Sequence, residues 1–342
     1  MQYMKLEPFN PVVKKEVSNT IINSLGGVFT CPDYDDTRYC IQYNEENNTL
    51  YFSFKIPNFN DIYKISGDYL MKKFYKEYTL EKVPAAGFDM TISRSLDIIK
   101  EIPKIKNPTP EDEENKKKIK EENKKNIENI SNELAKFRVN FLSCPFQHAF
   151  DQVREGKQPK FTYSTRQGDR VWCLGDAEQI TLFFGLSFQD IVDRNIAKLM
   201  LDEFVDIKKH IKNPPSITRT MEDQKFVYPQ NLIDAFPELK NIKEVFLNGL
   251  MQFTFFKKQH LNGDTDEVCN FLGTFRQYLH YHISASKSYL HIRLLKNINT
   301  NLTNLQRTKF EQEEERNYRS QRDELLSNKT QEDTKKNILI KQ

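Results

Sequence analysis

The sequence predicts an α+β fold made of two α/β units and a long C-terminal helix. Two separate stretches each contain a helical pattern, several strand patterns and further elements, as α+β domains do. A long run of helical spacing begins near residue 264. We therefore expect a first α/β domain at 1–103, a charged insertion or linker at 104–132, a second α/β domain at 133–263, a long basic helix at 264–310 and a charged helix extension or disordered tail at 311–342.

The first unit begins with a helical pattern over residues 10–25, which Gly26-Gly27 end. Strand patterns follow from Val28 (VFTC), Arg38 (RYCIQY) and Thr49 (TLYFSFKI), and the polar link at 44–48 predicts a hairpin between the last two. A second helical pattern covers 60–79, and GFDMTISRSL from Gly87 alternates as a strand does.

Residues 104–132 differ in composition from the units on either side. Pro108 and Pro110 open a run of Lys, Glu and Asn with almost no apolar side chains. Such a run cannot bury enough apolar surface to offset the entropy lost on ordering. We expect an exposed insertion or linker, partly helical where Glu and Lys alternate, with a specific binding arm as the less favoured alternative.

The second unit repeats the order of the first, although we find no sequence identity between them. A helical pattern covers 133–154, and strand patterns follow from Lys160 (KFTYST), Arg170 (RVWCL) and Gln179 (QITLFFGLSF). The apolar positions of 196–204 suit either a strand or a helix. Residues 210–240, with four prolines, predict a long irregular connection, and VFLNGLMQFTFF at 245–256 predicts a last strand. The shared order suggests a structural duplication.

Composition argues against several classes of function. The net charge of +3 over 342 residues does not favour nucleic acid as a partner. The five cysteines are odd in number and lack short repeated spacings, which argues against a disulfide framework. The first residues lack the apolar core of a signal peptide, and no window approaches 18 apolar residues. We expect a protein of the reducing cytosol with no membrane partner.

No set of residues predicts catalysis, a metal or a cofactor. Cys144 and His148 are four apart on a predicted helix, but two ligands do not make a metal site. His280 and His282 lie two apart, so on a helix they face different directions. The aspartates at 33–36 lack the glycine and terminal glutamate of a calcium loop and predict a turn. Phosphate-binding loops and nucleophile elbows are absent from the sequence, so an enzyme is the least favoured class.

The predicted C-terminal helix has the most informative pattern. Asp264 or Thr265 is placed to cap it, and the acidic residues that follow suit its positive N-terminal end. No Asp or Glu occurs over 271–309. The same stretch contains six cations, Arg276, Lys287, Arg293, Lys296, Arg307 and Lys309. We therefore predict a continuous cationic rod.

At about 100° per residue, the side chains of this helix divide into sectors. One narrow sector holds Arg276, His280, Lys287 and His291, and the next holds Leu272, Phe275, Leu279, Ile283 and Leu290. The apolar arc is extended further by Phe271, Tyr278, Tyr289 and Ile292. The cations Arg293, Lys296 and Arg307 point into this extended sector. So wide an arc predicts burial on two sides, against this chain and against a partner helix. An ordinary amphipathic helix with a solvated basic face is the alternative.

The string TFRQYLHYHISASKSYLHIR at 274–293 closely resembles the C-terminal helix of the p34-Arc family, subunit 2 of the actin-related protein 2/3 complex. Its specific part is YLHYHI followed by SKSYLHIR. The strings QFTFF before the helix, AKLMLDEF at 197–204 and AKFRVNFLSCPFQHAF at 135–150 stand in the expected order. The resemblance therefore covers most of 10–310.

This resemblance implies two α/β domains of similar topology, each an antiparallel sheet with helices, and a long C-terminal helix. It also implies a non-catalytic scaffold in the cytoplasmic cytoskeleton. Such a subunit pairs chiefly with subunit 4 among the other subunits, and contacts the mother actin filament during branched actin nucleation. The alternative is a free-standing actin-filament-binding module outside the complex.

The pattern of the helix and the resemblance together suggest which residues make these contacts. By position, Lys287 and Arg293 match cations of the family's helix, and Arg307 and Lys309 match a basic cluster near its end. The candidates for the acidic actin filament are Arg276, Lys287, Arg293, Lys296, Arg307 and Lys309. The candidates for the partner subunit are Phe271, Phe275, Tyr278, Tyr289 and Ile292. The helix departs from the family pattern at Ser284, Leu295 and Thr303, where basic residues are expected.

Overall fold

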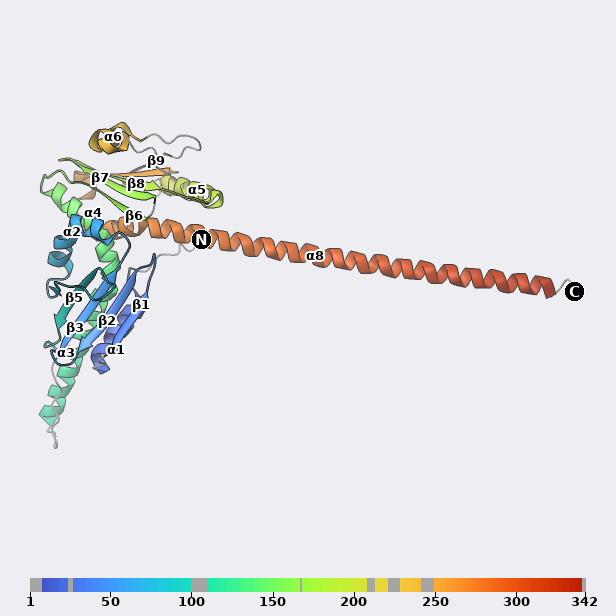
Figure 1. Ribbon diagram of the computed structural model, residues 1–342, viewed down its shortest axis with the longest axis horizontal. Helices are drawn as coiled ribbons and strands as arrows, with labels where there is room; N and C mark the ends of the chain where they lie inside the picture. Colours follow the sequence, from blue (N-terminus) through green and yellow to red (C-terminus); the bar gives the residue numbers. More distant parts are fainter. Residues whose placement is uncertain are drawn as a thin grey trace. The chain divides into compact units, whose positions relative to one another are not determined.

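The computed structural model describes residues 8–23, 27–99, 110–166, 168–207, 213–220, 228–240 and 249–339. Within these ranges it leaves undescribed the side chains of 110–111, 166, 207, 240, 301, 304–312 and 325–339. It contains two five-stranded antiparallel sheets and several helices (Figure 1). The predicted α+β class, with two α/β arrangements and a long C-terminal helix, is confirmed.

The first sheet has the strand order β1-β2-β3-β5-β4. Its strands are β1 (Val28–Pro32), β2 (Arg38–Asn44), β3 (Thr49–Lys55), β4 (Thr79–Leu80) and β5 (Met90–Ser95). All neighbouring strands pair antiparallel, with Tyr39 opposite Phe54 and Phe52 opposite Ile92. The expected hairpin between the second and third strand patterns is confirmed by this register.

The second sheet has the equivalent order, β6-β7-β8-β10-β9. Its strands are β6 (Lys160–Arg166), β7 (Asp169–Gly175), β8 (Gln179–Leu186), β9 (Ser216–Thr220) and β10 (Gly249–Phe256).

The helices of the two halves also correspond. An N-terminal helix precedes each sheet, α1 (Pro11–Asn23) or α4 (Phe137–Arg154), and a crossover helix follows the third strand, α2 (Phe59–Phe74) or α5 (Ile191–Ile207). A helix follows each last strand, α3 (Pro110–Ala135) or α8 (Asp266–Leu339), the latter after the short α7 (Lys257–His260). The shared order predicted from the sequence is thus confirmed, and 196–204 is helical.

The predicted irregular connection at 210–240 is wrong where the structure describes it. That part contains β9, α6 (Gln230–Ala235) and a 3-10 helix, η2 (Pro237–Lys240). Leu232 of α6, Leu239 of η2 and Phe236 between these helices pack against Trp172 of β7. The prolines misled the prediction because proline fits the first position of a helix, where its missing N–H costs nothing.

The charged segment at 104–132 is described only from Pro110 onward, and there it is helical and largely exposed, as expected where Glu and Lys alternate. From Pro110 onward the segment is the helix α3, and Glu114 pairs with Lys118 one turn later at 2.7 Å. Its last turns are not solvated, because Ile130 is buried and Ser131 Oγ lies 2.8 Å from Ser18 Oγ of α1. The charged composition did not indicate that the far end of this helix belongs to the core.

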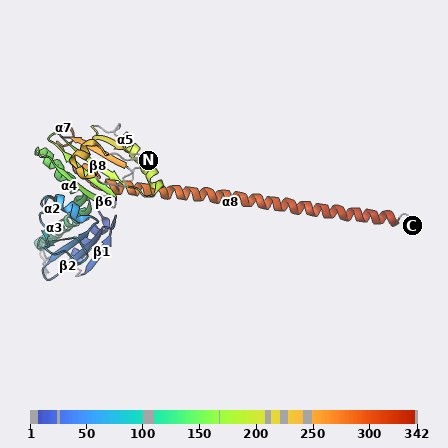
Figure 2. The same ribbon diagram turned by 45° about the horizontal axis from the view of Figure 1, so that its top comes forward.

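Helix α4 is the core element that the two sheets share (Figure 2). At its N-terminal end, Phe137 packs against Phe54 of β3, with ring centroids 4.8 Å apart. Two and a half turns later, Phe146 packs against Phe184 of β8, with centroids 5.9 Å apart. One helix therefore buries side chains against both sheets.

The chain forms two compact units, residues 1–281 and 282–342, and α8 extends from the first into the second. The helix extension predicted beyond residue 310 is present, since α8 continues to Leu339. Within the first unit, Gly273 of α8 meets the backbone of α4. A Cβ at this glycine would lie 2.7 Å from the carbonyl carbon of Leu142 and 2.8 Å from the nitrogen of Ser143. Only glycine allows so close a crossing.

We predict that Gly273→Ala lowers the free energy of unfolding by about 1–3 kcal/mol, because the added methyl group forces the two helices apart. Urea unfolding of the full chain measures this difference. Gly263→Ala is the matched control, since a Cβ there meets nothing within 4 Å. Equal stability of the two variants would contradict the tight crossing.

Candidate protein-binding surface of the C-terminal helix

The N-terminus of α8 is capped as the sequence predicts. The backbone N–H of Asp266 donates to Asp264 Oδ1 at 2.9 Å, and the N–H of Cys269 donates to the Thr265 carbonyl at 2.9 Å. Asp266 and Glu267 occupy the first turn, where carboxylates interact favourably with the helix dipole.

One face of α8 within the first unit belongs to the protein's own core. The buried residues on it are Cys269, Leu272, Phe275 and Leu279. Phe275 is 0 % exposed and lies among Phe184, Phe253 and Phe204, with ring centroids 5.2, 5.5 and 5.6 Å away. Because Phe275 has no surface left for a partner, we leave it out of the proposed partner surface.

Arg276, a candidate filament contact, forms an internal ion pair instead. Its Nε bonds the Asp169 carboxylate at the start of β7, and its guanidinium lies 4.8 Å from the centroid of Phe188. The side chains of Arg276 and Asp169 are only 12 % and 2 % exposed. The Asp169 carboxylate also accepts from the Ser187 N–H at 2.6 Å. Arg276 therefore stabilises the fold and is left out of the proposed filament surface.

The next residue, Gln277, joins α8 to the first sheet. Its Oε1 accepts from Arg138 Nη1 at 2.6 Å, and Arg138 Nε lies 3.2 Å from Asp33 Oδ2. The same oxygen of Asp33 accepts from the Tyr39 hydroxyl at 2.8 Å. The sequence analysis identified neither Gln277 nor Arg138, because their partners are more than 100 positions apart and no local pattern marks them.

The remaining candidates on this part of the helix are half-buried. Phe271 and Tyr278 both contact Phe204 of α5, with ring centroids 6.0 and 5.9 Å away. Lys287, in the second unit, is also half-buried. These three side chains keep part of their surface for a partner.

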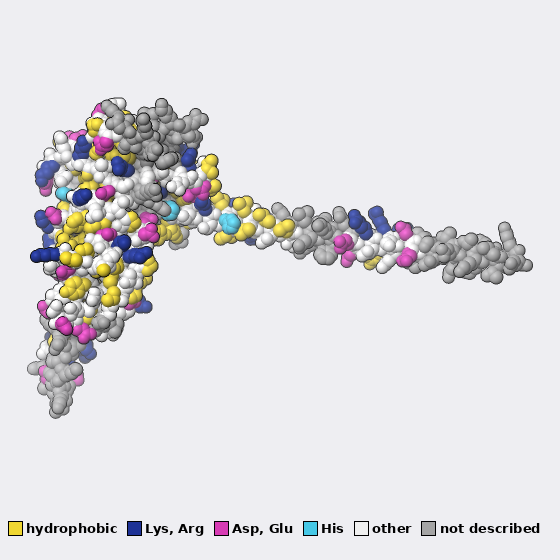
Figure 3. Space-filling model, viewed as in Figure 1, with side chains coloured by type: hydrophobic (Ala, Val, Ile, Leu, Met, Phe, Trp, Pro, Cys, Tyr) yellow, Lys and Arg dark blue, Asp and Glu magenta, His cyan; other side chains and the backbone are white. Residues whose placement is uncertain are grey.

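From Tyr289 onward the described side chains of α8 are exposed, and many are apolar (Figure 3). Tyr289 and Ile292 are both 65 % exposed. Arg293 and Lys296 are exposed too, whereas the side chains of Arg307 and Lys309 lie outside the described residues. The other exposed apolar residues are Leu290, Leu294, Leu295, Ile298 and Leu302.

These exposed residues fall on two sides of the helix. At about 100° per residue, Arg293 and Lys296 flank Tyr289 on one side. The opposite side holds what we call the apolar stripe, Leu290, Leu294, Leu295, Ile298 and Leu302. Within the stripe, Leu295, Ile298 and Leu302 are spaced by three and then four residues, which is the spacing of a coiled-coil seam. Arg293 and Lys296 can therefore contact a different partner from the one that the apolar stripe contacts.

The described residues include no group of three or more His, Cys, Asp or Glu side chains that could hold a metal ion. Burial raises the pKa of the Cys31 thiol to about 11 and that of Cys144 to about 12, so neither is an activated nucleophile. His148 stacks on Tyr69 and places Nδ1 3.3 Å from the Ile65 carbonyl, a packing role. No described helix has the length and apolar character needed to span a membrane.

A family model supports the resemblance carried by α8. The model of the Arp2/3 complex 34 kD subunit, p34-Arc, matches residues 52–312. The chain belongs to this family.

Two relatives are both named actin-related protein 2/3 complex subunit 2. The one from Dictyostelium discoideum is 24 % identical over 286 residues, which cover 82 % of this chain and 84 % of the relative. The one from Schizosaccharomyces pombe is 22 % identical over 287 residues, which cover 78 % and 81 %. Neither p34-Arc relative is named as an enzyme.

We predict that Arg276→Ala lowers the free energy of unfolding by about 3–5 kcal/mol, because it leaves the Asp169 carboxylate buried without its cation. Arg293→Ala, an exposed arginine on the same helix, is the control and should change stability by less than about 0.5 kcal/mol. Urea unfolding of both full-length variants measures the difference. If the two variants matched, Arg276 would return to the candidate surface contacts.

Proposed function

We propose that this chain is a non-catalytic scaffold subunit of an actin-related protein 2/3 complex in the cytoplasmic cytoskeleton. In this proposal it pairs with subunit 4 and contacts the mother actin filament during branched actin nucleation. The observation that carries the proposal is the exposed apolar stripe on a helix without acidic residues over 271–309. Membership of the p34-Arc family supports it.

The apolar stripe supports a partner helix as one contact. An isolated exposed leucine is unremarkable, but five apolar residues along one side of a helix leave a continuous surface that water solvates poorly. Their spacing suits a second helix packed side by side with α8. We propose subunit 4 as the source of this helix. Leu295, where the family pattern predicts a basic residue, strengthens the stripe.

The cations support an acidic surface as the other contact. Arg293 and Lys296 are exposed, lie on the side away from the stripe, and have no acid near them in sequence. Such an arrangement attracts an acidic partner such as the side of an actin filament. At about 100° per residue Arg307 falls on this side too, and we keep it in the proposed contact, whereas Lys287 and Lys309 fall on the side of the stripe. Around the helix, Tyr289 lies between Arg293 and Lys296, Ile292 lies next to Lys296, and we assign both to this side.

The stripe is tested by placing a charge within it. We expect Leu295→Asp with Ile298→Asp to reduce co-purification of the tagged chain with subunit 4 and the actin-related proteins at least about tenfold, because the carboxylates would be buried without partners. Native lysate pull-down, quantified against the wild type, measures this. Arg293→Glu with Lys296→Glu is the matched control on the opposite side and should leave co-purification unchanged. Recovery of the whole complex with the aspartate variant would remove the proposed helix pairing.

The cations are tested by filament co-sedimentation of the assembled complex. We expect Arg293→Glu with Lys296→Glu to weaken filament binding by about an order of magnitude, because attraction to the acidic filament becomes repulsion. The wild-type affinity should fall as salt rises. Arg316→Glu with Arg319→Glu makes the same charge change on an exposed part of α8 beyond residue 312, and serves as the control. Equal losses in both variants would argue for general charge attraction and against a specific contact.

Co-sedimentation also distinguishes the alternative, a free-standing filament-binding module. That alternative predicts a soluble monomer that sediments with filaments without other subunits. The exposed stripe favours the complex, because a monomer would leave it bare in water.

A further inference from the structure

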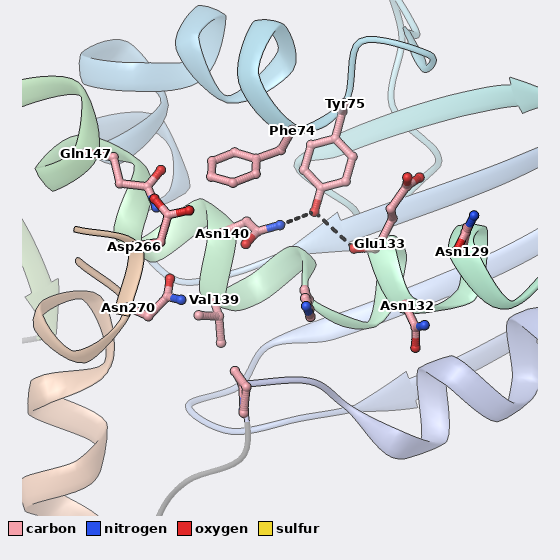
Figure 4. Close-up of a pocket in the computed structure, with 12 residues that line it drawn as sticks. Phe74, Tyr75, Asn129, Asn132, Glu133, Val139, Asn140, Gln147, Asp266 and Asn270 are labelled. Carbon is pink, nitrogen blue, oxygen red and sulfur yellow. Dashed lines mark hydrogen bonds between the residues drawn. The ribbon is translucent and has the colours of Figure 1, made fainter. Parts of the chain in front are cut away.

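A pocket of about 440 Å³ lies inside the first compact unit (Figure 4), and its lining includes no residue of the apolar stripe. It is formed where the end of α2, the junction of α3 and α4, and the first turns of α8 meet. Its size falls in the range of ordinary small-ligand pockets, about 300–1,000 Å³. The residues that decide its chemistry are Phe74, Glu133, Asn140, Gln147, Asp266 and Asn270.

Two amide oxygens at one end of this pocket have no hydrogen-bond partner. Gln147 of α4 is 2 % exposed, and its Oε1 is buried without a donor. Asn270 Oδ1 of α8 is buried without a donor as well. Leaving such a group unsatisfied costs about 1–3 kcal/mol, so buried polar atoms almost always have partners. Both atoms therefore mark a place where a donor is missing.

Further acceptors and an aromatic ring surround these oxygens. Figure 4 shows Gln147 beside Asp266, with Phe74 and Asn140 close to them. The Asp266 carboxylate forms a loose ion pair, 3.7 Å from Lys73 Nζ. The same ammonium lies 5.7 Å from the centroid of Phe74, so one side of this ring already attracts a cation.

The lining is not strongly charged overall. Glu133 is paired with Arg94 at 2.9 Å, and the exposed Lys136 lies at the pocket. Recognition would therefore depend on directed oxygen atoms more than on net charge. A guanidinium group has five N–H donors, no acceptor and a flat face that stacks on aromatic rings. Its donors match the unpaired oxygens of Gln147 and Asn270.

We propose that this pocket binds a guanidinium group on a short apolar stem, as in an arginine side chain. The group would donate to Gln147 Oε1, Asn270 Oδ1 and the Asp266 carboxylate, while its stem contacts Phe74. The proposal is independent of the scaffold function, because none of its residues lies in the apolar stripe or among the proposed filament contacts. The same chemistry is available from a free small molecule or from an arginine of another polypeptide.

The test is a titration of the full-length chain with arginine amide at constant ionic strength, followed by NMR of the Gln147 and Asn270 side-chain amides. We expect a dissociation constant of roughly 1–10 mM, since a ligand of this size has few contacts. Citrulline amide, which has a neutral urea in place of the guanidinium, should bind at least about tenfold more weakly. Equal binding of the two amides, or no shift of these signals, would overturn the proposal.

One variant expected to weaken binding and one expected to tighten it distinguish an effect on the pocket from an effect on folding. Gln147→Leu should weaken arginine amide binding about tenfold, because it removes the buried acceptor. Asn270→Asp should tighten binding at least about threefold, because it adds a carboxylate. Gln152→Leu is the matched control on the same helix, since Gln152 donates to His148 outside this pocket and should leave binding unchanged. A tightening by Asn270→Asp cannot come from unfolding, and its absence would count against the assignment.

A competition experiment distinguishes the two sources of the guanidinium group. Acetyl-Gly-Arg-Gly-amide presents the side chain as a polypeptide does, whereas agmatine presents it as a free small molecule. Tighter binding of the peptide assigns the pocket to an arginine of a partner chain, and tighter binding of agmatine assigns it to a small molecule. If neither competes with arginine amide, the pocket is only solvated and the proposal fails.

Discussion

The first turns of α8 fix the arrangement of the larger unit, because three consecutive contacts depend on them. Gly273 brings the helix into backbone contact with α4. Arg276 then pairs with the Asp169 carboxylate at the start of β7, and Gln277 accepts from Arg138, which bonds Asp33 between β1 and β2. Neighbouring positions on one helix are thus joined to both sheets. Since these ionic groups are nearly excluded from water, a change in helix register would leave buried charges without partners.

Further along, the same helix exposes residues of the same types as those buried near its start. Phe275 is internal while Ile292 is exposed, and Arg276 is internal while Arg293 is exposed. The apolar residues of α8 therefore have different roles in the early and the later part of the helix. The first part seals the protein's own core, and the later part leaves the apolar stripe available to another chain. This division supports a subunit in which the start of α8 is fixed in the protein's own core and the later part binds another chain.

The duplicated topology explains where the pocket arises. Each half places a helix before its sheet and another after its last strand, so α3, α4 and α8 converge next to the end of α2. Converging helices present amide and carboxylate side chains from several directions, and Gln147 and Asn270 come from two of them. The second half differs by α6 and η2, whose apolar residues cover Trp172. The halves therefore share a backbone plan while differing in what covers each sheet.

Local pattern alone determined the strand runs, the capped start of α8 and the family, because alternation, helical spacing and the string YLHYHI with SKSYLHIR are short-range signals. It misread the segment after α5, because proline content obscured helices that tertiary packing stabilises, and it did not indicate that the end of α3 is buried. Only the tertiary structure decided which arginine is internal. Arg276 and Arg293 look alike in sequence, and the difference is a carboxylate that folding brings from more than 100 residues away. The unpaired oxygens of Gln147 and Asn270 were likewise invisible, since an unmet hydrogen bond is defined by what surrounds the atom in space.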